Sequence, residues 1–115
     1  MTGELSVQHR TGSTCDIVEL AGEIDLSNVD RIEGAVAGRP SLVVDLSNVS
    51  YIDSAGLGVL IETERERRQN GGYVRLVIPP GHIARRLLEL TGTATVLSTY
   101  PTLESALDGD EPEEA

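Results

Sequence analysis

The stretch YIDSAGLGVLI, residues Tyr51 to Ile61, follows the apolar run Leu42-Val43-Val44. A buried strand, a short loop, a serine and an apolar helical stripe together predict a strand-loop-helix unit, whose stripe consists of Leu57, Leu60 and Ile61. The strand, Leu42 to Leu46, is apolar on both faces, so we expect it inside a sheet. The pattern predicts a helix that starts at Ser54, with Ser54 as its N-cap, and runs to Asn70, where Gly71-Gly72 supply the C-cap.

Ser54 is a candidate site as well as a cap. An N-cap hydroxyl points to the free amides of the first helical turn, where the helix dipole also favours an anion such as a phosphate. Gly56 and Gly58 are poor helix formers in that turn, so helix propensity is low where a partner's backbone could approach closely. The spacing alone leaves both interpretations open, a plain cap or a functional serine.

Composition narrows the class of protein. The 115 residues suit a single domain, and the absence of Phe and Trp requires an aliphatic core. A net charge of −10, from 9 basic and 19 acidic residues, argues against binding to nucleic acid or to an anionic membrane. The one cysteine, Cys15, excludes an internal disulfide framework and suits a reducing compartment. No apolar run approaches the roughly 20 residues of a membrane-spanning helix, so we expect a cytoplasmic protein.

The rest of the chain supplies further elements. We expect strands at Leu5 to Gln8 and Cys15 to Leu20, joined as a hairpin. Ser27, with Asp30 three positions later, resembles a capping box that opens the first helix. The later elements expected from the pattern are a strand at Tyr73 to Ile78, a helix that turns Ile83, Leu87, Leu88 and Leu90 inward, a short strand at Thr95 to Leu97, and a helix at Pro101 to Leu107. Residues 108–115 are acidic, and we expect a disordered tail there.

After the hairpin, strands and helices alternate along the chain. This order predicts an α/β fold with a mixed, mostly parallel sheet of four to five strands and about four helices. Sites in such sheets form beyond the carboxyl ends of the strands. Asp25 and the loop from Asn48 to Ser54 belong to that edge, so we expect Asp25 and Ser54 to be neighbours in space.

Several kinds of catalytic or metal site are not supported. A hydrolase elbow requires G-x-S-x-G, and the leading glycine is absent before Ser54. The two histidines, His9 and His82, are better explained as solvated or capping residues than as a base. Ile61 stands where a dinucleotide loop requires its third glycine, and the cysteine and histidines have no metal-ligand spacing. We therefore expect no catalytic residue, no metal and no cofactor, and interpret the carboxylates of Asp25 and Asp53 as loop caps.

Three segments resemble the STAS domain family, specifically the bacterial anti-sigma factor antagonists. SLVVDLSNVSYIDSAGLGVLI, residues 41–61, is similar to the family signature and contains D-S-A-G-L-G at residues 53–58. GEID at residues 22–25 and LLELTG at residues 87–92 resemble two further family elements in the expected order. The resemblance covers most of the chain and implies a single STAS domain over residues 1–107.

The resemblance implies a regulatory protein and no enzyme. In such families the unmodified antagonist binds an anti-sigma factor serine kinase and so releases a sigma factor. The kinase phosphorylates the serine that matches Ser54, and a PP2C-type phosphatase removes the phosphate. The residues implied to bind the partner are Asp25, Asp53, Ser54, Ala55, Gly56, Leu57 and Gly58. A constitutive STAS scaffold or transporter-associated subunit, in which Ser54 is merely a cap, is the alternative.

Overall fold

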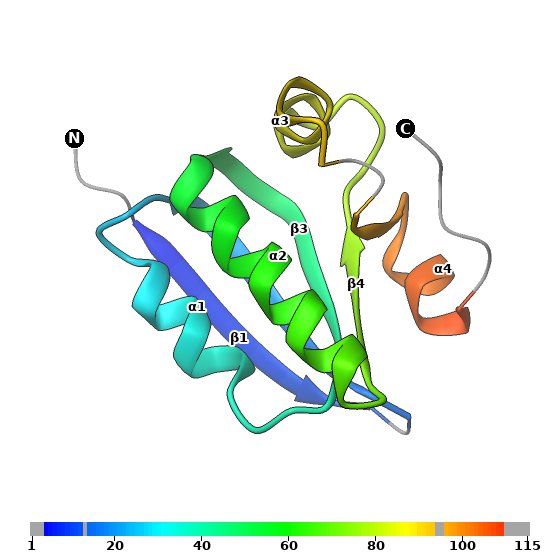
Figure 1. Ribbon diagram of the computed structural model, residues 1–115. Coiled ribbons are helices and arrows are strands. Elements are labelled where there is room, and N and C mark those ends of the chain that lie inside the picture. Colours follow the sequence, from blue (N-terminus) through cyan, green and yellow to red (C-terminus); the bar gives the residue numbers. More distant parts are fainter. Residues whose placement is uncertain (1–3, 13, 94–95, 110–115) are drawn as a thin grey trace.

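The computed structural model describes residues 4–12, 14–93 and 96–109, and these form one five-stranded sheet (Figure 1). The strands are β1 (Leu5–Thr11), β2 (Asp16–Ile24), β3 (Ser41–Ile52), β4 (Tyr73–Val77) and β5 (Ser98–Tyr100). They lie in sequence order; β1 is antiparallel to β2, and the remaining neighbours are parallel. The mixed, mostly parallel sheet and the N-terminal hairpin predicted from the sequence are confirmed.

The described residues include the helices α1 (Val29–Val36), α2 (Ser54–Gln69), α3 (Ile83–Thr91) and α4 (Leu103–Asp108). Figure 1 shows α1 and α2 side by side over the same part of the sheet, α3 near the upper ends of β3 and β4, and α4 on the far side of β4. None of these helices is long and apolar enough to cross a membrane.

The two faces of the sheet have separate apolar cores. Val18 and Val44 pack with α1, α2 and α3, whereas their neighbours Ile17 and Val43 pack with Ala106 of α4. Successive strand residues point to opposite faces, so this alternation shows that β2 and β3 are buried on both sides. The expectation that Leu42 to Leu46 is internal is confirmed, since β4 and β2 pair with it on either side.

Several strand boundaries were predicted wrongly. β2 continues to Ile24 and β3 to Ile52, beyond the apolar runs that marked them, because their second halves pair with each other through irregular register around Gly22. Gly22 adopts a φ of +103°, and a Cβ there would lie 2.1 Å from the carbonyl oxygen of Glu4. The last strand is Ser98–Tyr100 and not Thr95 to Leu97; Thr95 lies outside the described residues.

The C-terminal helices also differ from the predictions. In α3, Leu88 is buried as expected and Leu87 packs partly against the core, but Ile83 and Leu90 are exposed. The inward stripe of this short helix instead consists of Ala84 and Leu88, four residues apart. The helix α4 includes Asp108, which was assigned to the acidic tail, and residues 110–115 lie outside the described residues.

Candidate functional site

The N-cap of α2 is Asp53, so the prediction that Ser54 caps the helix is wrong. Asp53 has extended backbone angles, and its Oδ1 accepts a hydrogen bond from the amide of Gly56 at 3.0 Å. Asp and Ser are comparable N-caps, but the carboxylate also interacts favourably with the positive end of the helix dipole. Ser54 is therefore the first helical residue.

The hydroxyl of Ser54 is free to react. Ser54 is exposed, and within the part of the chain that the structure describes its hydroxyl has no hydrogen-bond partner. Because Asp53 supplies the cap, a chemical group added to Ser54 would not remove it. The first amides of a helix have no acceptor within the helix. That of Gly56 is bonded to Asp53, so the amides of Ser54 and Ala55 are the ones a phosphate on this residue could use.

The loop that contains Asp25 lies at the same edge of the sheet, as predicted. The residues Ile24 and Ile52 are register partners, and the amide of Asp53 donates to the carbonyl of Ile24 at 3.1 Å. Asp25 directly follows Ile24 in the chain, and Ser54 directly follows Asp53. Figure 1 shows the loop from β2 to α1 beside the start of α2.

A network of side-chain hydrogen bonds fixes this loop. Oδ1 of Asp25 accepts from both the amide and the hydroxyl of Ser27, and Oδ1 of Asn28 accepts from the amide of Asp25 at 3.0 Å. The side-chain amide of the buried Asn28 donates to the carbonyl of Glu23 at 2.9 Å. The predicted capping box at Ser27 and Asp30 is therefore wrong: Asn28 is the N-cap of α1, and Ser27 bonds back to Asp25, which lies closer in sequence.

The two glycines of the first α2 turn have different surroundings. A Cβ on Gly56 would lie 2.4 Å from Cγ2 of Ile24 and 3.0 Å from Cγ1 of Ile52, so this glycine permits the close approach of α2 to the strands. A Cβ on Gly58 would meet nothing within 4 Å. Gly58 is exposed, and Gly56 lies in the interior.

The candidate partner-binding residues divide according to burial. Ser54 and Gly58 are exposed, and Asp25, Asp53 and Ala55 are half-buried. Leu57, like Gly56, is buried and belongs to the core beneath the helix. A partner that docks here thus meets the small residues at positions 54, 55 and 58 and the two carboxylates.

Leu26, on the loop between Asp25 and Ser27, was not among the predicted site residues. Its side chain is 76% exposed, the largest exposed fraction among the large apolar residues that the structure describes. One feature of the sequence could have indicated it. Leu26 is a large apolar residue outside the apolar stripe of α1, whose buried residues start at Ile32, so the helical pattern does not place it in the core.

The titratable side chains gathered at this edge are the carboxylates of Asp25 and Asp53, and the two histidines have other positions. His82 follows β4 and caps α3, its Nδ1 accepting from the amide of Ala84 at 3.0 Å, which confirms its interpretation as a capping residue. His9 lies in β1 and pairs with Val18, away from the start of α2. Across the described ranges, no three His, Cys, Asp or Glu side chains are arranged to hold a metal ion. What this edge offers chemically is one accessible hydroxyl at a helix start.

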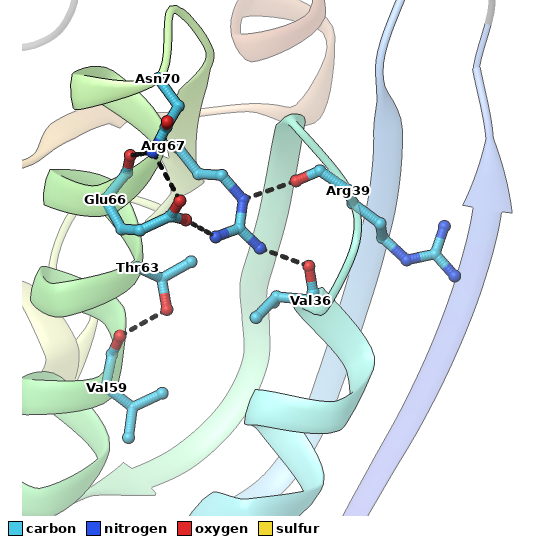
Figure 2. Close-up of polar contacts among 7 residues, drawn as sticks. All are labelled: Val36, Arg39, Val59, Thr63, Glu66, Arg67 and Asn70. Carbon is cyan, nitrogen blue, oxygen red and sulfur yellow. Dashed lines mark hydrogen bonds and ion pairs between the residues drawn. The ribbon is translucent and has the colours of Figure 1, made fainter.

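The far end of α2 is fixed to the rest of the molecule by Arg67 (Figure 2). Its Nε donates to the carbonyl of Arg39 at 2.6 Å and its Nη2 to the carbonyl of Val36 at 2.5 Å, and it also pairs with Glu66. The helix ends at Gln69 with Asn70 as the C-cap, and Gly71, with a φ of +85°, lies just beyond it. These contacts and the Asp53 cap hold both ends of the helix that presents Ser54.

Comparison with known proteins gives consistent matches. A family model described as STAS domain matches residues 6–106. The chain is 30% identical to the anti-sigma F factor antagonist of Paenibacillus polymyxa, over 93% of this chain and 94% of that protein. It is 34% identical to the anti-sigma-F factor antagonist RsfB of Mycobacterium tuberculosis, over 81% of this chain and 79% of the relative. The crystal structure of an anti-sigma factor antagonist from Mycobacterium paratuberculosis superposes with a TM-score of 0.81 at 29% identity, over 92% of this chain and 93% of that chain.

Proposed function

Because this chain belongs to the STAS domain family and is related to bacterial anti-sigma factor antagonists, we propose that its unphosphorylated form binds an anti-sigma factor serine kinase and so releases a sigma factor. Phosphorylation of Ser54 ends this binding, and a PP2C-type phosphatase restores it. The protein acts by association and catalyses no reaction. Its place of action is the cytoplasm, where bacterial transcription occurs.

The observation that carries the proposal is the position of Ser54. Its hydroxyl is exposed at the first residue of α2, while the neighbouring Asp53 carries the structural task of capping. A kinase requires a hydroxyl that it can reach and that the fold does not need for itself. Ser54 meets both requirements.

The charge and size of a phosphate on Ser54 would weaken binding of the partner. A phosphoserine adds about 1.5 to 2 negative charges at neutral pH. The added group would stand beside the carboxylate of Asp53, at a helix start whose other accessible residues, Ala55 and Gly58, are small. A kinase that phosphorylates Ser54 must hold the phosphates of its nucleotide against this hydroxyl, so the product phosphate meets like charge. A mispaired charge of this kind costs a few kcal/mol, enough to change a complex from mostly bound to mostly free.

Phosphorylation mapping tests the assignment. The purified chain is incubated with candidate anti-sigma factor kinases and ATP, and each phosphosite is located by mass spectrometry. We expect one phosphate on Ser54 and none on Ser54→Ala. Ser50→Ala is the matched control, because Ser50 is also exposed and lies four residues earlier, near the end of β3; it should be phosphorylated as the parent chain is. A kinase that binds the chain and leaves Ser54 unmodified would instead support a constitutive scaffold.

A further inference from the structure

We propose that Leu26 is the apolar anchor by which this chain engages its anti-sigma factor, and that the partner receives it in an apolar pocket bordered by cationic side chains. The inference rests on the proposed function and names the recognition chemistry of the same surface. No other large apolar side chain of the described residues exposes a larger fraction than the 76% of Leu26.

The loop presents Leu26 in a fixed position. Its neighbours Asp25 and Ser27 are hydrogen-bonded to each other. The side-chain oxygen of Asn28 accepts from the main-chain amide of Asp25, and the main-chain amide of Asn28 donates to the carbonyl of Asp25 at 3.1 Å, which closes the turn. An apolar side chain held on a rigid loop loses little conformational entropy when it is buried by a partner. Nothing in these contacts requires a leucine at position 26, because they involve its neighbours and the backbone.

The pairing of β2 with β3 brings Leu26 and Ser54 to the same edge of the sheet. Leu26 and Ser54 each stand two residues beyond the register partners Ile24 and Ile52, and the Asp53–Ile24 hydrogen bond ties their loops together. A single partner surface centred on Ser54 therefore covers Leu26 as well. Buried apolar anchors near the centre of an interface contribute most of the binding energy.

The surroundings of the anchor are acidic. Asp25 and Asp53 flank the site, Glu23 precedes it, and Asp30 is exposed on the first turn of α1. Arg31, also exposed on this turn, directs its guanidinium to the carbonyl of Leu5. Electrostatic complementarity then favours Lys and Arg around the partner's pocket.

Three of the other exposed apolar residues, Ile83, Leu90 and Leu107, are less suited to this role. Ile83 and Leu90 lie on α3, which follows β4, two strands away from β2 in the sheet. Leu107 lies on α4, whose Leu103 and Ala106 pack with the opposite core. They provide comparison sites on the same chain.

Binding of substituted chains to the anti-sigma factor kinase, measured by isothermal calorimetry, tests the anchor. Leu26→Ala should bind about 30-fold more weakly, the loss typical of a hot-spot residue, and leave thermal stability unchanged. Leu90→Ala, the matched control because Leu90 is 73% exposed, should bind as the parent does. Affinity of the parent should also fall as NaCl rises from low to high concentration, because the cationic rim is screened.

The outcomes separate the anchor from the function on which it rests. If the parent binds, Ser54→Asp binds weakly, and Leu26→Ala equals the parent, the anchor is overturned while the proposed function stands. If binding is lost equally in Leu26→Ala and Leu90→Ala, the effect is not specific to this loop and the anchor is also overturned. A parent that binds no anti-sigma factor kinase overturns both. A loss confined to Leu26→Ala, together with salt-sensitive binding, supports the anchor.

Discussion

The main-chain amide of Asp53 donates a hydrogen bond to the main-chain carbonyl of Ile24, at 3.1 Å. This bond joins the loops that follow β2 and β3 just beyond their last register pair, Ile24 and Ile52. Since Asp53 also caps α2, one residue fixes the helix start and its distance from the Asp25 loop. The surface around Ser54 is therefore preorganised by the fold.

Replacement of Asp53 should separate capping from phosphorylation. Asp53→Ala loses the hydrogen bond to the amide of Gly56 and should lower the free energy of unfolding by about 1 kcal/mol. Asp53→Asn retains a good capping side chain and should lose less. Ser54→Ala should have little effect, because the hydroxyl of Ser54 is not the cap. Urea denaturation followed by circular dichroism measures all three; a larger loss for Ser54→Ala than for Asp53→Ala would show that the cap is assigned wrongly.

Alanine at the two glycines of α2 should have opposite effects. Gly56→Ala places a methyl group 2.4 Å from Cγ2 of Ile24 and should destabilise the fold by about 1 to 3 kcal/mol, despite the better helix propensity of alanine. Gly58→Ala enters open space and should stabilise by up to about 1 kcal/mol. Thermal unfolding of the two variants gives the comparison. Equal effects would mean that α2 does not approach the strands as closely as described.

Arg67, near the C-terminal end of α2, should contribute more to the free energy of unfolding than Arg65 on the same helix. Arg67→Ala removes the guanidinium donor from the carbonyls of Arg39 and Val36, of which Val36 keeps the amide of Arg39 at 3.3 Å, and should cost about 1 to 3 kcal/mol of unfolding free energy (Figure 2). Arg67→Lys should recover only part, because an ammonium cannot reproduce the planar fork. Arg65→Ala is the control, since its pair with Glu62 is exposed and should contribute little. Denaturant titration would contradict this account if the Arg65 and Arg67 variants behaved alike.

Tyr73 should make the fold sensitive to high pH. Burial, with a contribution from a hydrogen bond to Cys15, raises the pKa of the Tyr73 phenol above its ordinary value of 10.0. The unfolded chain then releases this proton at lower pH than the folded chain, so the stabilisation is complete below about pH 10 and is lost as pH rises through the folded pKa. Unfolding free energy measured from pH 8 to 11 should fall more steeply for the parent than for Tyr73→Phe. Parallel curves would rule out a raised pKa.

The sequence predicted the α/β architecture because strong apolar runs mark its central elements. Val43 and Val44 lie in a strand that is buried on both faces, and such a strand is readable from composition alone. The extensions to Ile24 and Ile52 were not readable, since their residues are polar on the outer side and their pairing depends on a bulge. Register irregularities are set by neighbouring strands, not by local propensity.

The candidate site was predicted in position but not in its local chemistry. The topology rule correctly brought the loop of Asp25 beside the start of α2. Asp53 and Ser54 are adjacent and both residue types are good N-caps, so the sequence alone could not decide which of them caps α2. Burial of Gly56 against Ile24 and exposure of Leu26 depend on how closely two elements approach, which a sequence pattern does not contain.

The most direct test of the central claim compares two forms of the same chain. The unmodified protein and the protein stoichiometrically phosphorylated on Ser54 are titrated into the anti-sigma factor kinase, and the dissociation constants are measured under one set of salt and nucleotide conditions. We predict that the unmodified form binds and that the phosphorylated form binds at least about 100-fold more weakly, which corresponds to roughly 3 kcal/mol. Equal affinity of the two forms would contradict a phosphorylation switch at Ser54.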